Sequence, residues 1–280
     1  MLGVAAPRLD DALLDAWLAE DLGDGDVTSE ATVPADRRAS ARLLVKAPGV
    51  VCGLALAERV FTRLDPDLVF EAVLRDGARV DEPPAVAATL EGRARALLAG
   101  ERLALNLVGR LSGIATQTAR YVDAVAGTGA AILDTRKTTP GLRALEKYAV
   151  ACGGGRNHRL GLFDAVLIKD NHIAVAGSLS EAVRRARAYA PGLEVEVEAD
   201  TLMQVHEALE AGADAILLDN MPPARLAEAV ALVAGRARTE ASGGITLEGI
   251  AAVGRSGVDT ISVGALTHSA ANLDVSLEVE

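Results

Sequence analysis

Residues 193–220 read LEVEVEADTLMQVHEALEAGADAILLDN and contain one full repeat of the pattern that decides the fold. Two runs, LEVEVEAD at 193–200 and AILLDN at 215–220, are typical of strands, and a polar turn and a helical pattern separate them. A strand, a helix and a second strand joined by short connections predict parallel strands with a right-handed crossover.

The same period extends over the second half of the chain. Helical patterns such as SEAVRRARAYA from Ser180 and PARLAEAVALVA from Pro223 alternate with further strand-like runs. Those runs lie at 130–136, 165–171, 238–244 and 260–265. Six strands in this alternation favour a β/α barrel, which need not be complete.

The first half of the chain is organised differently. Its predicted elements are a helix ending near Gly23, a polar loop over 24–34, strands at 40–47, 69–74 and 85–92, a helix over 54–64 and a long helix over 100–126. Mixed short strands with one intervening helix are typical of an α+β layer. We therefore predict an α/β protein with two domains, an N-terminal α/β sandwich over 1–112 and a barrel over 113–280, and leave open a return of the last residues to the first domain.

Composition excludes several classes of protein. With 280 residues, half of them hydrophobic, the chain can bury a substantial core. No run approaches about 18 apolar residues and the N-terminus lacks a basic, then apolar leader, so we expect a cytoplasmic protein with no membrane partner. The chain has only 2% aromatic residues and a pI near 4.9, which argue against nucleic acid. Cys52 and Cys152 lack metal-site spacing, and we expect reduced thiols without a disulfide or metal role.

Cations concentrate between Ile132 and Ala174, although the whole chain has a formal net charge of -11. This segment has a formal charge of +3, so the remainder has a charge of -14. The segment reads ILDTRKTTPGLRALEKYAVACGGGRNHRLGLFDAVLIKDNHIA. A local positive region in an acidic protein indicates a small, highly anionic ligand.

Polar or glycine residues occur where each predicted barrel strand ends. They are Arg136, Lys137, Lys169, Glu198, Asp219, Ser242, Gly243 and Gly264. In a β/α barrel these ends meet on one face, where active sites are built. We therefore expect these residues to form one site.

Some of these residues have a second interpretation. Arg136 and Lys137 could be a solvated strand end, but the following TTP also suits an anion-binding turn. Lys169 ends an apolar strand, where a lysine is costly unless it is paired or faces a ligand. Asp219 could bind ribose hydroxyls, bind a metal–phosphate complex or cap the next helix. His172 is assigned only a supporting role.

Glu194, Glu196 and Glu198 alternate with valines, so period two places the three carboxylates on one face of a strand. If the valines face the outer helices, the glutamates point into the barrel. The alternative is an exposed edge strand, where charge is common. His158 and Arg159 follow three glycines. A flexible turn accounts for the glycines, but it accounts less well for the two cations.

The chain closely resembles the carboxylating nicotinate-nucleotide pyrophosphorylase family, also called quinolinate phosphoribosyltransferase. The resemblance covers nearly the whole length and rests on EDLGDGDVTSEATVP (20–34), ERLALNLVGRLSGIAT (101–116), LDTRKTTPGLRALEKYAV (133–150), GGGRNHRLGL (153–162), LIKDNH (167–172), ILLDN (216–220), SGG (242–244) and VGALTHS (263–269). It implies an α/β sandwich joined to a β/α barrel, and a homodimer with shared sites, a hexamer being also compatible. It further implies that quinolinate and phosphoribosyl pyrophosphate are converted to nicotinate mononucleotide, pyrophosphate and CO2 with Mg²⁺, in NAD biosynthesis.

The resemblance also implies roles for single residues. Arg136, His158, Arg159 and Lys169 correspond to the residues around the quinolinate carboxylates, with Thr135 beside them. Lys137 lies near the ribosyl substrate, and Arg102 reaches in from the other subunit. Glu198 and Asp219 face the ribose and its Mg²⁺, directly or through the substrate; with Lys137 they are the expected catalytic residues. The 5′-phosphate is expected on two turns, Ser242, Gly243 and Gly244 and Val263, Gly264 and Ala265. Arg110 matches none of these roles.

Three other functions fit parts of the pattern. A Schiff-base aldolase would use Lys169 or Lys137 at a strand end as its nucleophile. A paralogue of the same fold associated with molybdenum uptake is disfavoured by the complete TRK and NHR motifs. A non-catalytic binding protein does not explain why so many charged groups converge on one site.

Overall fold

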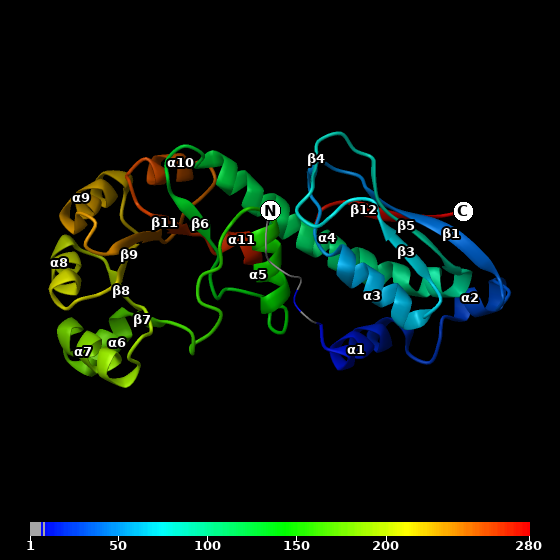
Figure 1. The fold of residues 1–280 in the computed structure, drawn as a ribbon, viewed down its shortest axis with the longest axis horizontal. Coiled ribbons are helices and arrows are strands. Elements are labelled where there is room, and N and C mark those ends of the chain that lie inside the picture. The colour runs from blue at the N-terminus through cyan, green and yellow to red at the C-terminus, as the bar shows by residue number, and fades with distance from the viewer. Residues whose placement is uncertain (1–6, 8) are drawn as a thin grey trace. The chain divides into compact units, whose positions relative to one another are not determined.

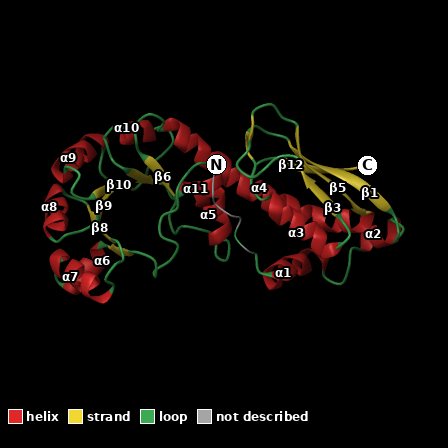
Figure 2. Ribbon diagram, viewed as in Figure 1, coloured by secondary structure: helices red, strands yellow, loops and turns green. Residues whose placement is uncertain are grey.

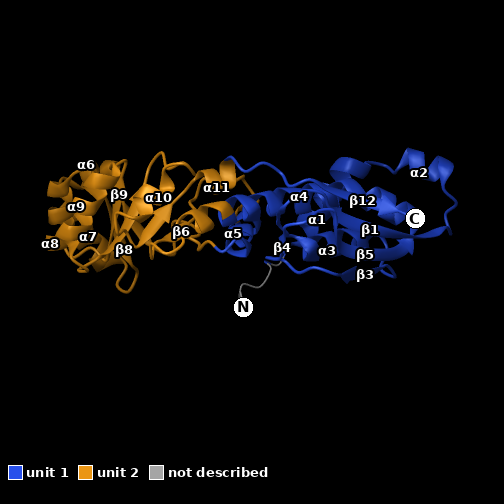
Figure 3. Cartoon of the chain, turned by 90° about the horizontal axis from the view of Figure 1, so that it is seen from above, with its two compact units in different colours: residues 1–119, 144–154, 269–280 blue, residues 120–143, 155–268 orange. Residues whose placement is uncertain are grey.

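The computed structural model describes Pro7 and residues 9–280 (Figure 1). The chain divides into two compact units, shown in different colours in Figure 3. Unit 1 comprises residues 1–119, 144–154 and 269–280, and unit 2 comprises residues 120–143 and 155–268. The division falls inside helix α4 (Ala94–Ala124), as does the sequence-based boundary after residue 112.

Unit 1 is built on an antiparallel sheet. Its strand order is β12-β1-β5-β3. The elements of this unit besides α4 are α1 (Asp11–Leu22), α2 (Val27–Thr32), β1 (Arg38–Val45), β2 (Gly49–Val50), α3 (Leu54–Leu64), β3 (Val69–Ala72), β4 (Arg79–Val80), β5 (Ala85–Arg93), α5 (Arg143–Cys152, whose first residue belongs to unit 2) and β12 (Val275–Val279). The helices α3 and α4 lie along one side of this sheet (Figure 2).

The hydrophobic pattern of unit 1 explains this packing. Val60 and Phe61 of α3 are fully buried, and so are Leu97 and Val108 of α4. The C-terminal strand β12 pairs with β1, with Val279 opposite Ala41. The last residues therefore complete the sheet of unit 1.

Unit 2 contains six parallel strands in the order β6-β11-β10-β9-β8-β7. Its elements are β6 (Ala131–Leu133), β7 (Val166–Ile168), α6 (Asp170–Ala176), α7 (Leu179–Tyr189), β8 (Val195–Ala199), α8 (Leu202–Glu210), β9 (Ala215–Asp219), α9 (Pro223–Val233), β10 (Arg238–Ser242), α10 (Ile250–Gly254), β11 (Thr260–Ser262) and α11 (Ala265–His268). Helices α7 to α10 lie outside the strands (Figure 1). The predicted fold class, a sandwich followed by an incomplete barrel, is confirmed.

The barrel is open between its first two strands. Within residues 9–280, no ladder joins β6 to β7, and only a single bridge connects Leu133 of β6 to Arg156. The segment that follows Arg156 therefore enters the gap and can place side chains inside the barrel.

Most predicted elements match the structure, with differences at their ends. The helix over 54–64 is found as α3, whereas the strands of unit 2 are one to four residues shorter than predicted. The predicted loop over 24–34 is wrong in part, because α2 forms there. The Asp26 carboxylate accepts a hydrogen bond from the Ser29 backbone N–H at 3.0 Å and so caps this helix. No helix of the described chain is long and apolar enough to span a membrane.

Candidate active site

The ends of the parallel strands surround a cavity of about 450 Å³ in unit 2. All six strand ends contribute to its wall, as the barrel architecture predicts. The lining residues are Thr135, Arg136, Lys137, His158, Arg159, Leu167, Lys169, Glu198, Leu217, Asp219, Asn220, Glu240, Ser242, Gly243, Gly244 and Ser262. Eleven of these were predicted for the site from the sequence.

The turn after β6 presents Arg136 and Lys137. The Thr267 hydroxyl donates to the Lys137 backbone carbonyl of this turn at 2.7 Å, and the Arg143 guanidinium donates to the Thr138 side-chain hydroxyl at 3.0 Å. Within the described chain, neither Arg136 nor Lys137 forms an ion pair with a carboxylate. Two exposed cations that no acid neutralises suit a turn that receives an anion.

The loop through the open side of the barrel carries His158 and Arg159. Fully buried Asp134 anchors it by accepting hydrogen bonds from the Asn157 amide (2.6 Å) and the His158 backbone N–H (2.9 Å). Burial, and then the neighbouring Arg136, lower the pKa of Arg159. An anion between Arg136 and Arg159 would relieve this repulsion.

His158 is held between the loop backbone and two buried acids. Its Nδ1 accepts the Arg159 backbone N–H at 2.7 Å, so the proton of the ring lies on Nε2. Nε2 lies 3.1 Å from Glu196 Oε2 and 3.5 Å from Glu240 Oε1. Nε2 therefore donates to Glu196, and Glu240 Oε1 lies nearby without a hydrogen bond.

The two acids under His158 are almost completely buried, Glu240 at 0% and Glu196 at 3% exposure. Burial and then the Glu196 charge raise the pKa of Glu240 to about 7, although His158 and Arg238 oppose the shift. Among the described residues, Glu196 Oε1 and Glu240 Oε1 have no hydrogen-bond partner. Glu196 and Glu198 point inward as predicted, while exposed Glu194 pairs with Arg238 at 2.8 Å.

Lys169 stands at the end of β7 and pairs with Glu198 of β8. Lys169 Nζ lies 2.6 Å from Glu198 Oε2. His172, for which the sequence predicted a supporting role, accepts the Lys169 backbone N–H at its Nδ1 at 3.0 Å. This ion pair joins the ends of β7 and β8 in the pocket wall. It places a cation beside a carboxylate, and the turn that carries Asp219 is next to it.

The turns after β9 and β10 are connected to each other. The Asn220 amide donates to Asp219 Oδ2 at 2.5 Å, and the Asn220 backbone N–H donates to the Ser242 carbonyl at 2.9 Å. Asn220 adopts a left-handed backbone with φ 53°. A Cβ on Gly243 would lie 2.2 Å from Asn220 Oδ1, and Gly243 itself has φ +93°, so glycine is required at this position.

The remaining predicted residues lie outside the pocket wall. Gly264 packs against Lys137, since a Cβ at Gly264 would lie 3.0 Å from Lys137 Cδ, but Val263, Gly264 and Ala265 are not among the lining residues. Arg102 is an exposed residue of α4 in unit 1. Arg110 joins parts of unit 1 by pairing with buried Glu146 at 2.8 Å and donating to the Ala270 carbonyl at 3.0 Å.

Five lining residues were not predicted for the site: Leu167, Leu217, Asn220, Glu240 and Ser262. Period two could have identified Glu240, because Arg238, Glu240 and Ser242 alternate with Thr239 and Ala241 along β10. Leu167 and Leu217 are apolar strand residues and carry no sequence signal that separates a pocket wall from a core.

The donor atoms in the pocket suit Mg²⁺. Glu198 and Asp219 lie on neighbouring strands, and the Asn220 amide follows directly. Mg²⁺ in enzymes is commonly held by one or two carboxylates together with substrate phosphates, and it prefers oxygen ligands. These residues therefore fit the ion that the sequence predicted.

Comparison with known proteins agrees with this architecture. A family model described as the quinolinate phosphoribosyl transferase C-terminal domain matches residues 114–278, and the corresponding N-terminal domain matches residues 26–112. The chain belongs to the quinolinate phosphoribosyltransferase family. Curated members of the family are similar over nearly the whole chain.

A Bacillus subtilis protein named "Probable nicotinate-nucleotide pyrophosphorylase (carboxylating)" is 46% identical over 95% of this chain and 92% of its own length. A Nicotiana tabacum protein named "Quinolinate phosphoribosyltransferase (decarboxylating) 1b" is 45% identical over 94% of this chain and 80% of its own. The solved structure of NadC from Streptococcus pyogenes has a TM-score of 0.94 and 42% identity, with 98% of this chain and 99% of that chain covered.

Proposed function

We propose that the pocket of unit 2 is the active site of a decarboxylating quinolinate phosphoribosyltransferase. The enzyme converts quinolinate and phosphoribosyl pyrophosphate to nicotinate mononucleotide, pyrophosphate and CO2, a step in NAD biosynthesis. The observation that carries the proposal is the joining, in one pocket, of four cations (Arg136, Lys137, Arg159 and Lys169) with two carboxylates (Glu198 and Asp219). Family membership supports the same reaction.

Quinolinate is a planar dianion, and the pocket offers a match for both properties. Arg136, Arg159 and Lys169 provide charge for its two carboxylates, and Leu167 and Leu217 provide apolar surface for its ring. Arginine is suited to planar, bidentate carboxylate recognition. His158 completes the wall next to Arg159 and fixes the position of that loop through Glu196.

The sugar donor lies against the opposite part of the wall in this proposal. Glu198 and Asp219 face the ribose hydroxyls, Lys137 faces the pyrophosphate, and the glycine turn of Ser242, Gly243 and Gly244 receives the 5′-phosphate with its backbone N–H groups. Bound Mg²⁺, held by Glu198 and Asp219 directly or through the substrate, would neutralise charge on the pyrophosphate. In the second small-residue turn, Gly264 packs against the Lys137 side chain.

The chemistry follows from these positions. The quinolinate nitrogen forms a bond to the anomeric carbon while the bond to pyrophosphate breaks, through an oxocarbenium-like state. Glu198 and Asp219 stabilise the positive charge on the sugar, and Lys137 stabilises the negative charge on the leaving group. The immediate product is a pyridinium. When the adjacent carboxylate departs as CO2, the electron pair of the broken bond stays on the ring carbon, where the charged nitrogen beside it stabilises the negative charge. A proton then takes the place of that carboxylate, and no separate base is needed.

A Schiff-base aldolase is less consistent with the pocket. Its nucleophile must present a free amine, and one of the two candidates, Lys169, has its Nζ engaged by Glu198 at 2.6 Å, which leaves only Lys137. Borohydride trapping with a carbonyl substrate checks this alternative directly.

We also propose that the chain acts as a homodimer with shared sites, in which Arg102 of each subunit enters the pocket of the other. Arg102 is exposed on α4, as this role requires.

The two cysteines are free, which supports a cytoplasmic location.

The deciding experiment measures pyrophosphate release that depends on quinolinate, the sugar donor and Mg²⁺. We expect stoichiometric CO2 and nicotinate mononucleotide. Replacing quinolinate with nicotinate, which lacks the second carboxylate, should abolish turnover. Absence of any product at high enzyme concentration would refute the proposed reaction.

The two acids allow a finer test of the substrate positions. We expect Glu198→Gln and Asp219→Asn to raise the KM for the sugar donor or lower kcat, while quinolinate affinity stays within about threefold of wild type, because carboxylates repel this dianion. Isothermal calorimetry with quinolinate alone measures that affinity. Loss of quinolinate binding in Glu198→Gln would show that Glu198 contacts quinolinate and not the sugar donor.

A further inference from the structure

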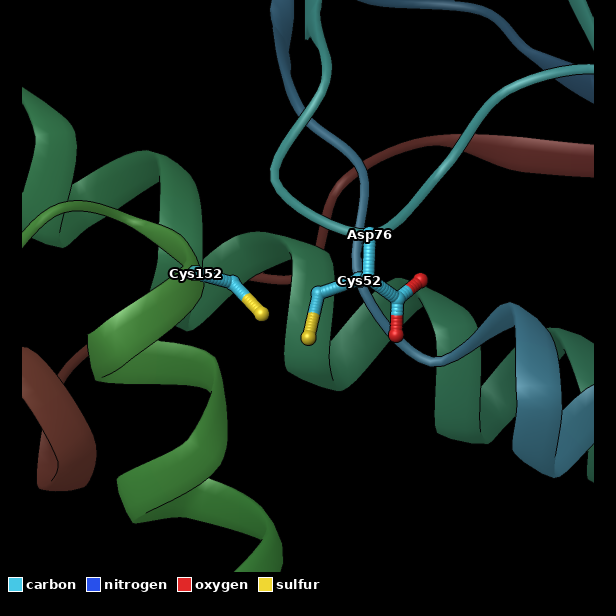
Figure 4. Close-up of side chains that lie close together, drawn as sticks. All are labelled: Cys52, Asp76 and Cys152. Carbon is cyan, nitrogen blue, oxygen red and sulfur yellow. The ribbon is translucent and has the colours of Figure 1, made fainter. Parts of the chain in front are cut away.

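Two cysteines that are 100 residues apart in the sequence meet in unit 1 beside an acid. One donor atom from each of Cys52, Asp76 and Cys152 can be chosen so that all three lie within 4.8 Å of one another. Figure 4 shows the sulfur atoms turned toward each other, with the Asp76 carboxylate beside Cys52. Both cysteines are buried and free. Neither the reaction nor the pocket of unit 2 uses this cluster.

The backbone positions of the two thiols are tightly held by α4. The Cys52 N–H donates to the Ser112 hydroxyl at 2.8 Å, and this hydroxyl donates back to the Cys52 carbonyl at 3.1 Å. Cys152 ends α5, and the next residue, Gly153, packs so closely on α4 that a Cβ there would lie 2.3 Å from the Ala115 carbonyl oxygen. The two sulfurs are therefore brought together by rigid elements.

The carboxylate of Asp76 is oriented by two hydrogen bonds. Its Oδ1 accepts the Leu54 N–H at 3.1 Å, at the start of α3, and its Oδ2 accepts the Tyr148 hydroxyl at 2.9 Å. Burial, and then the Asp76 charge, raise the pKa of Tyr148, so this phenol remains a donor. Hydrogen-bonded carboxylates of this kind are typical of the shell around metal ligands.

We propose that Cys52, Cys152 and Asp76 form a binding site for a thiophilic divalent cation such as Zn²⁺, with Tyr148 orienting the carboxylate. In a tetrahedral Zn²⁺ site the donor atoms lie about 3.3–3.8 Å apart, and the three donor atoms here already lie within 4.8 Å of one another. Two sulfur donors select Zn²⁺ over Mg²⁺. Binding replaces the two thiol protons, which are released to solvent, and leaves a fourth position for water.

The site differs in kind from a redox pair. A disulfide would need only the two sulfurs and gives no reason for a carboxylate held beside them by two donors. The sequence predicted no metal role for these cysteines, because neither lies in a CxxC or histidine pattern; tertiary structure alone joins them.

The test uses the full-length reduced protein, stripped with a chelator and titrated with Co²⁺ in the presence of excess Mg²⁺. We expect one equivalent of Co²⁺ to produce sulfur-to-cobalt charge-transfer absorption, and Zn²⁺ to displace it. Cys152→Ser should abolish the band, and Tyr148→Phe, which leaves all three ligands in place, should weaken Co²⁺ binding about tenfold or more. Glu198→Gln, in unit 2, is the matched control and should retain the band.

Three outcomes would overturn the proposal. They are no charge-transfer band at saturating Co²⁺, a band that Cys152→Ser leaves unchanged, or rapid loss of both thiols to a disulfide in metal-free protein that then binds no Co²⁺. Circular dichroism of each variant confirms that it is folded, and Tyr148→Phe keeps the test decisive if Cys152→Ser does not fold.

Discussion

At the scale of single residues, the pocket is defined by charges that the protein itself does not neutralise. Arg136 and Lys137 meet no carboxylate in the described chain, and Arg159 is repelled by Arg136. Beneath them, Glu196 and Glu240 are buried, and each has an oxygen atom without a hydrogen-bond partner among the described residues. Such groups destabilise the free protein, and binding sites tolerate this cost because a ligand offsets it.

Removing a pocket lysine should therefore affect activity far more than stability. We expect Lys137→Ala and Lys169→Ala to lower kcat/KM about 100-fold or more, the range found for lost electrostatic stabilisation of a transition state. Both side chains are exposed, so the free energy of unfolding should change by less than about 0.5 kcal/mol. Exposed Lys46→Ala in unit 1 is the control and should alter neither quantity. A fall in melting temperature as large as that of a core cavity would make the lysines structural.

Glu240 gives a prediction about pH. Its pKa rises from an ordinary 4.5 to about 7, so between these values the native protein holds a proton that the unfolded chain has lost. The free energy of unfolding therefore falls as the pH rises through this window, and the loss is complete above about pH 7. Glu240→Gln removes the loss and should be more stable than wild type at pH 8, by up to about 3 kcal/mol, with little advantage at pH 4.5.

Urea unfolding of both proteins at the two pH values measures this difference. The groups facing Glu240 are Glu196, His158, Arg238, Thr260 and Ser262, and all five remain in the variant. An advantage of Glu240→Gln that is equal at pH 4.5 and pH 8 would show that the carboxyl does not titrate in this range.

At the scale of elements, the ends of β9 and β10 form one unit with two turns. The two turns meet where Gly243 packs against Asn220. The Asn220 backbone N–H also donates a hydrogen bond to the Ser242 carbonyl. The position of Asp219 depends on this contact, because Asn220 also donates to its carboxylate. A single glycine thus positions a carboxylate on the neighbouring strand.

Gly243→Ala should disrupt this contact. The new methyl carbon would lie 2.2 Å from Asn220 Oδ1 in addition to the strain of φ +93°, whereas Gly235 has φ +74° with nothing within 4 Å. We expect Gly235→Ala to cost about 1–2 kcal/mol from backbone strain alone. Gly243→Ala should cost more and also lower kcat/KM. Denaturant unfolding and the product assay compare the two variants, and equal stability losses with unchanged activity would contradict a role of Gly243 in placing Asp219.

At the scale of the whole molecule, the proposed dimer makes each active site composite. Arg102 lies in unit 1 and Lys137 in unit 2. If Arg102 serves the pocket of the other subunit, Arg102→Ala and Lys137→Ala chains are each inactive in their homodimers. A heterodimer of the two has one intact site and one site that lacks both residues.

Mixing the two variants by unfolding and refolding should therefore restore activity. Random pairing makes about half of the dimers heterodimers, and one of their two sites works, so we expect about a quarter of the wild-type activity. Refolded single variants serve as controls. If heterodimers form, as native mass spectrometry can show, and no activity returns, Arg102 acts within its own chain.

Much of this protein follows from local sequence pattern. Alternation of strands and helices predicted the parallel sheet, because short connections and a right-handed crossover leave few other arrangements. Strand ends of a barrel converge, so Arg136, Lys169, Glu198 and Asp219 could be assigned to one site before their positions were known. The glutamates of β8 could be placed together on one face because side chains alternate along a strand, and this face points inward if the valines meet the outer helices.

Other features depend on contacts between distant segments, which no local pattern encodes. Only the tertiary structure turns His158 Nε2 toward Glu196 and Glu240, because the His158 loop enters the barrel through the gap between β6 and β7. The same holds for the thiols of Cys52 and Cys152, joined through their separate packing on α4. Periodicity determines which face of a strand or helix a side chain occupies. The packing of distant segments determines which side chains then meet, and these contacts set the charge of each group and the ligands that it can bind.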